Sequence, residues 1–156
     1  MPFQITGLDA SPFRRFYGLS DEELHSLGVK RFIADKKPGF PDRIELRDAE
    51  QGEAVLLLNY LHQPADTPYK ASHAIFVREW AETPYRATDE IPDVLRIRPI
   101  SLRAFDASGD MVDADLVIAG GYLEPTVERL LANPEAAYIH AHYAKRGCYA
   151  ARIDRA

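Results

Sequence analysis

Two histidines near the end of the chain, His140 and His142, stand two positions apart in a segment of strand character. Alternate residues of a β-strand point to the same face, so both imidazoles should reach one site. If Lys145-Arg146-Gly147 forms a three-residue loop with a left-handed glycine, Cys148 joins that face, whereas a two-residue loop would turn Cys148 away. Imidazole and thiolate ligands together favour a transition metal such as zinc.

Two other interpretations of the same residues stay open. A thiol–imidazole pair, Cys148 with His142, would give nucleophilic chemistry without a metal. Alternatively, one histidine is hydrogen-bonded in the core and Cys148 is a small buried hydrophobic residue. Spacing alone does not choose among these three.

A second group consists of arginines set among apolar residues, together with one tyrosine: Arg43, Tyr69, Arg78 and Arg103. The guanidinium group holds a carboxylate or phosphate in fixed geometry, so these residues could converge on a compact anionic ligand. In the alternative interpretation each arginine forms a structural ion pair with a nearby carboxylate. The candidate carboxylates are Glu45, Glu79 and Asp106.

The strands and helices expected from the sequence, which must position these residues, indicate an α+β fold. It should have a largely antiparallel sheet of about six to eight strands and two short helices. One helix should run from Asp21 to Leu27, capped by Ser20 and Glu23 and ended by Gly28. The other should begin near Pro125 and stop before Asn133. The expected strands are 29–34, 43–46, 54–61 as a buried centre strand, 74–80, 95–106 with a break at Pro99, 112–118 with its even-numbered apolar residues inward, 137–143 and 148–154.

The composition predicts a single domain over residues 1–156 and excludes several classes of protein. A net charge of −5 argues against a nucleic-acid partner, which needs a basic face. No apolar run reaches the length of a membrane helix, so we expect no membrane partner. A single cysteine and the lack of a visible secretory signal favour a cytoplasmic protein.

The chain resembles the bacterial family known as domain of unknown function 1203 (DUF1203). The resemblance rests on an ordered series of segments: Pro38-Gly39-Phe40-Pro41 with Arg43, Gly52-Glu53 before Leu56-Leu57-Leu58, Pro68-Tyr69, Ile75-Phe76-Val77-Arg78-Glu79, Ser101-Leu102-Arg103-Ala104, His140-Ala141-His142 and Gly147-Cys148-Tyr149. The family pattern has Cys in place of Asp42 and Gly-Pro in place of His73-Ala74. The resemblance implies no known activity.

Three functions are therefore carried forward. The leading hypothesis is a small domain that binds a compact anionic small molecule through a pocket of Arg43, Tyr69, Arg78 and Arg103. The alternative is an enzyme that uses His140, His142 and either Cys148 or Asp42, with zinc as the expected cofactor or with the thiol as nucleophile. The third is an interaction or assembly domain, in which edge strands pair between two copies in a homodimer.

Overall fold

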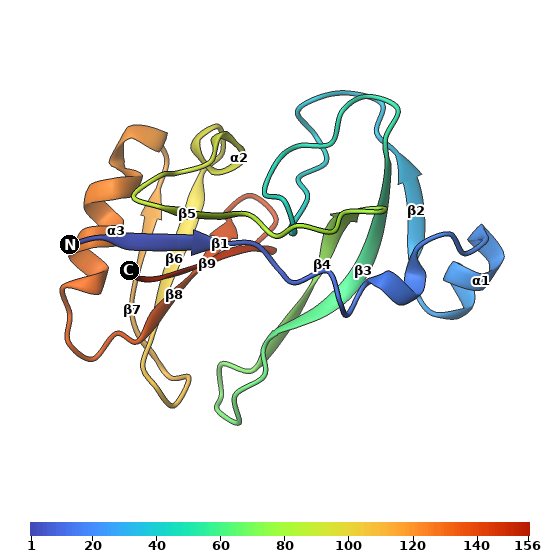
Figure 1. Ribbon diagram of the computed structural model, residues 1–156. Helices are drawn as coiled ribbons and strands as arrows, with labels where there is room; N and C mark the ends of the chain where they lie inside the picture. Colours follow the sequence, from blue (N-terminus) through green and yellow to red (C-terminus); the bar gives the residue numbers. More distant parts are fainter.

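Nine strands form two antiparallel sheets in the computed structural model, which describes all 156 residues (Figure 1). The six-stranded sheet has the order β5 (Arg86–Thr88), β1 (Phe3–Thr6), β9 (Tyr149–Arg155), β8 (Tyr138–Tyr143), β6 (Ile100–Phe105) and β7 (Met111–Val117). The three-stranded sheet has the order β2 (Lys30–Ile33), β3 (Ala54–Gln63) and β4 (Ala71–Arg78). The predicted α+β class with antiparallel strands is confirmed, although the strands divide over two sheets.

Three short helices and two 3-10 turns complete the chain. They are η1 (Arg14–Phe16), α1 (Asp21–Ser26), α2 (Asp93–Arg96), η2 (Gly120–Tyr122) and α3 (Leu123–Leu131). The predicted capping box is present in α1, because Ser20 and Glu23 exchange hydrogen bonds, and Gly28 follows with a φ of +76°. The helix predicted from Pro125 is α3, which begins two residues earlier.

One predicted strand is wrong, and of the two segments predicted on either side of Pro99 only the second is a strand. Residues 43–46 form a turn, because the Asp42 carboxylate accepts the backbone N–H groups of Glu45 and Arg78 and Leu46 takes a positive φ of 52°. Residues 95–99 contain the end of the unpredicted helix α2, and only the part after Pro99 is a strand, β6. A proline at this point ends one element and allows the next to begin.

Burial along β7 also differs from the prediction. The even-numbered side of this strand was expected to be inward, yet Leu116 is 55% exposed and Ile118 is 67% exposed. β7 is the edge strand of its sheet, and its contact with the core is limited to the buried Val117 and the partly buried Val112. The strand β3 is the centre of its sheet, as predicted, but it is not buried along its whole length, because Asn59 and Leu61 are exposed between the buried Leu58 and His62.

The two sheets lie side by side, with α3 on the outer side of the larger one and α1 on the outer side of the smaller one (Figure 1). One hydrophobic core fills the space between the larger sheet and α3. A second core lies against β3 and β4, and it includes Tyr149 of β9. Tyr149 therefore joins the two sheets, and the candidate site lies around it.

No helix of this structure combines the length and the apolar composition that crossing a membrane requires.

Candidate functional site

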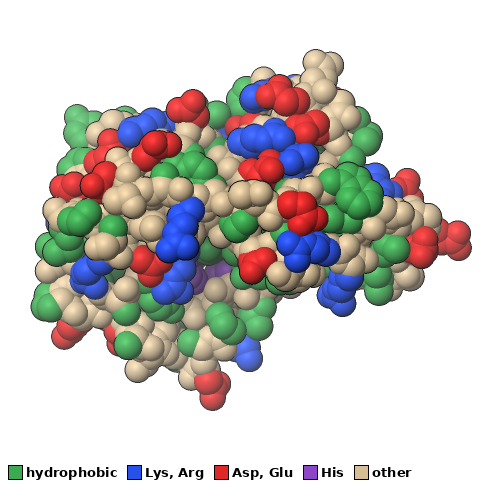
Figure 2. Space-filling view, viewed as in Figure 1, with side chains coloured by type: hydrophobic (Ala, Val, Ile, Leu, Met, Phe, Trp, Pro, Cys, Tyr) green, Lys and Arg blue, Asp and Glu red, His purple; other side chains and the backbone are tan.

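Three histidines from both sheets come together at the junction. They are His62 of β3, His73 of β4 and His142 of β8, and one potential ligand atom from each lies within 4.8 Å of the other two. The His62 and His73 rings stack at a centroid distance of 4.7 Å, with His62 Nε2 and His73 Nδ1 2.7 Å apart. In Figure 2 histidine side chains are visible at the bottom of a hollow between the two halves of the molecule.

An irregularity in strand pairing lies beside two of these histidines. The β3–β4 register shifts between Leu61 and Gln63, so His62 is the extra residue of a bulge. The β8–β9 register also shifts, but there the extra residue is Ala150 of β9. A bulge bends the strand that carries it and redirects a side chain, and such bulges are frequent next to active sites. The bulge in β3 therefore redirects His62, whereas His142 keeps the regular alternation of β8.

The hydrogen bond of His142 leaves one ring nitrogen free to bind a ligand. Nδ1 lies 2.9 Å from the backbone carbonyl of Gly147 and donates to it, since a carbonyl only accepts. Nε2 is then the unprotonated nitrogen, and it is buried without a partner. A metal-binding histidine typically has this arrangement, with its second nitrogen fixed by a carbonyl or carboxylate.

Burial keeps the histidines neutral. Desolvation lowers the pKa of His62 to about 4 and those of His140 and His142 to about 3, and it also lowers the pKa of His73. The positive charge of Arg103 lowers all four pKa values further. Neutral imidazole is the form that coordinates a metal, so the cluster is in its binding form at neutral pH.

His140 lies beside the three histidines but outside the group within 4.8 Å. As predicted, it shares a face with His142, because both rings contact His62 and Tyr149. Its cross-strand neighbour on β6 is Arg103. The Arg103 guanidinium forms no ion pair, and its only side-chain partner is Ser101, at 3.3 Å.

Cys148 does not lie in the histidine group. The turn after β8 has four residues, 144–147. The Tyr143 backbone N–H donates to the Cys148 carbonyl, the Tyr143 carbonyl accepts from the Gly147 N–H, and Tyr149 stands opposite His142. Neither the three-residue loop nor the two-residue loop considered from the sequence therefore forms, although Gly147 has the positive φ, 80°, that the three-residue loop required. The Cys148 sulfur instead accepts a hydrogen bond from Arg43 at 3.1 Å.

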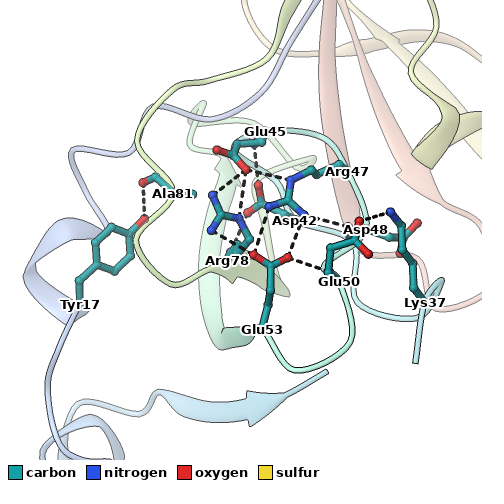
Figure 3. Close-up of polar contacts among 10 residues, drawn as sticks. All are labelled: Tyr17, Lys37, Asp42, Glu45, Arg47, Asp48, Glu50, Glu53, Arg78 and Ala81. Atoms are coloured by element: carbon teal, nitrogen blue, oxygen red, sulfur yellow. Dashed lines mark hydrogen bonds and ion pairs between the residues drawn. The ribbon is translucent and has the colours of Figure 1, made fainter. Parts of the chain in front are cut away.

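The four residues of the predicted anion pocket have separate surroundings. Arg43 is buried and donates to the backbone carbonyls of Tyr149 and Pro41 as well as to Cys148. Arg78 pairs with two carboxylates, Glu45 at 2.8 Å and Glu53 at 3.3 Å (Figure 3). Tyr69 is 41% exposed and its ring lies 6.4 Å from that of Phe105. Of the four, Arg103 is the one placed beside the histidines, and a shared binding role stays a prediction.

Two of the three converging histidines had no recognisable signal in the sequence. His62 follows an apolar run and His73 lies in a loosely alternating segment, in strands that pair with each other and not with β8. Their proximity to His142 depends on how the two sheets meet.

The fold and the site define a mixed α+β protein with a buried histidine cluster between two antiparallel sheets. Residues 39–155 match the family described as "Protein of unknown function (DUF1203)". The chain belongs to this family, which confirms the resemblance drawn from its sequence motifs. Neither the curated proteins nor the solved structures contain a match to this chain.

Proposed function

We propose that the protein binds a divalent transition metal through His62, His73 and His142 and uses it to act on a small anionic substrate. The observation that supports the proposal most strongly is the convergence of three imidazoles, with the buried Nε2 of His142 left without a hydrogen-bond partner. Buried polar atoms almost always have partners, so this unpaired nitrogen indicates a missing ligand. Zinc suits an all-nitrogen set of this kind.

Three protein ligands leave one position of a tetrahedral metal open, as in catalytic zinc sites. A bound ion at such a position supplies water of lowered pKa, which is the reagent for hydrolysis or hydration. Arg103 is half-buried beside the cluster and has no carboxylate partner. A guanidinium group in that position suits the carboxylate or phosphate group of a substrate. The proposal thus combines the metal and the anion hypotheses at one site.

Titration with Co²⁺ tests the metal site, because four-coordinate Co²⁺ has strong visible absorption bands. The wild-type protein should bind one equivalent and develop these bands. His142→Ala should abolish them, whereas His25→Ala, which removes an exposed histidine on α1, should leave them unchanged. His142 is fully buried, so its replacement could disturb the fold. His73 is partly exposed, and His73→Gln therefore serves as a second variant. Unchanged bands in both His142→Ala and His73→Gln would exclude the proposed ligands.

The role of Arg103 is tested on the same Co²⁺ protein with inorganic phosphate as the probe. Phosphate should perturb the visible spectrum at the open position, and Arg103→Gln should weaken its apparent affinity by about ten-fold, in line with the loss of a charge-assisted hydrogen bond. Arg129→Gln is the matched control, because Arg129 lies exposed on α3. Equal affinity in wild type and Arg103→Gln would remove Arg103 from the site.

A further inference from the structure

A cavity with Tyr143 of β8 in its wall lies outside the histidine group, and the proposed metal centre does not use it. Its volume is about 490 Å³, which lies in the range of small-molecule sites. Four segments form its walls, namely the β2–β3 connection, β4, the residues before β6 and the β8–β9 turn. The lining residues that matter here are Lys36, Phe40, Phe76, Tyr143, Arg146 and Cys148.

The lining of this cavity is basic, although the chain as a whole is acidic. The protein carries a net charge of −5, yet the lining contains four basic residues and one acidic residue, Asp35. Arg98 is neutralised by Asp48 at 2.6 Å. The other three bases are the exposed Lys36, Lys145 and Arg146, and none of them forms an ion pair. With Asp35 as the only carboxylate against these three basic residues, the rim presents a net excess of positive charge to solvent.

A buried positive charge, that of Arg43, lies behind the wall of the cavity and is not part of its lining. Arg43 is only 1% exposed and forms no ion pair, because its donors go to two backbone carbonyls and to the Cys148 sulfur. A buried charge without a counter-ion is costly. Its guanidinium carbon lies 4.9 Å from the centroid of the Tyr143 ring, in the cavity wall. An anion bound in the cavity would offset part of this cost.

The polar and aromatic groups of the wall indicate the rest of the ligand. Tyr143 is 6% exposed and its hydroxyl has no hydrogen-bond partner in the protein. The Phe40 and Phe76 rings pack edge to face at 5.3 Å. Aromatic side chains in a small cavity bind flat apolar groups, and an unpaired buried hydroxyl requires a polar partner.

We propose that this cavity binds a compact aromatic anion, with its ring among Phe40, Phe76 and Tyr143, its charge facing the basic rim, and Cys148 in contact with it. The site is separate from the metal centre and does not depend on it. The geometry of the cavity, the excess of unpaired basic groups and the free Tyr143 hydroxyl support the same class of ligand.

The test compares 2-naphthoate with its neutral counterpart 2-naphthamide by isothermal titration calorimetry. The anion should bind at least ten-fold more tightly than the amide. The double substitution Lys36→Gln with Arg146→Gln should remove most of this preference, whereas Lys70→Gln, at an exposed lysine outside the cavity, should retain it. The preference should persist in His73→Gln, which separates this site from the metal centre.

Cys148 gives an internal reporter of position, since it is the only cysteine in the chain. Saturating 2-naphthoate should slow its alkylation by iodoacetamide at least three-fold, and equal concentrations of 2-naphthamide should not. Equal binding of the two probes, no binding of either, or a preference that survives the double substitution would each overturn the proposal. Unchanged alkylation at saturation would place the anion elsewhere and overturn it as well.

Discussion

The metal-free protein should lose much of its stability in mild acid, because its buried histidines resist protonation. The pKa is lowered to about 4 for His62 and to about 3 for His140 and His142. In the unfolded chain each should titrate near 6.5. As the pH falls below that value, the unfolded state binds protons that the folded state does not, so the free energy of unfolding decreases.

The size of this effect follows from the linkage relation. Between pH 7 and pH 5 each histidine that stays neutral in the folded state removes about 2 kcal/mol, so the three together remove about 6 kcal/mol. A domain of this size has a total stability of about 5–15 kcal/mol. The lowered pKa of His73 acts in the same direction, and the neighbouring charges of Arg103 and Arg152 contribute to these shifts. The metal-free protein should therefore be marginally stable near pH 5.

Urea unfolding of chelator-treated protein at pH 7, 6 and 5 measures this loss, with the fluorescence of the single tryptophan, Trp80, as the probe. His140→Gln removes one titrating group and should reduce the loss between pH 7 and 5 by about one third, that is by about 2 kcal/mol. The exposed His25→Gln should leave the loss unchanged. Equal stability at pH 7 and pH 5 in wild type, or an identical loss in His140→Gln, would refute the reasoning.

Other substitutions test how the fold holds the site. Asp42→Ala should lower the free energy of unfolding by about 2–6 kcal/mol, because two backbone N–H groups lose their acceptor. Chemical denaturation measures this change, and a loss below about 2 kcal/mol would contradict it. Gly7→Ala should destabilise far more than Gly121→Ala, since an added Cβ at position 7 would overlap the Ile44 carbonyl, whereas nothing lies near position 121; equal melting temperatures would contradict this. Leu116→Lys should leave the melting temperature nearly unchanged, because Leu116 is exposed, and a large decrease would show that β7 is covered in solution.

Local sequence signals predicted the elements that depend on neighbouring residues. The cap formed by Ser20 and Glu23, the stop at Gly28 and the shared face of His140 and His142 all follow from spacing within a few positions. These features need no knowledge of tertiary packing. The α+β class followed from the sum of such segments.

The metal-ligand set could not be predicted in the same way. His62 and His73 approach His142 only because two separate sheets meet, and a bulge in β3 redirects His62. Strand spacing contains no information about either event. The exposed side of β7 has a similar cause, since position at the edge of a sheet depends on strand order and not on the alternation of residues.

The surroundings of Arg43 also could not be predicted from the sequence. Its sequence position beside Asp42 gave no reason to expect a fully buried guanidinium whose donors go to carbonyls and a sulfur. Burial of this kind depends on contacts with β9, more than one hundred residues away along the chain. Long-range contacts therefore decide whether an arginine binds a ligand or supports the fold.

Elemental analysis of the untagged protein, purified without chelator from zinc-supplemented medium, tests the central claim most directly. The account predicts close to one equivalent of zinc per chain in wild type and in His25→Ala, and a loss of that zinc in His142→Ala with the fold retained by circular dichroism. A wild-type protein that holds no metal as purified, and takes up none when zinc is added back, would contradict the account.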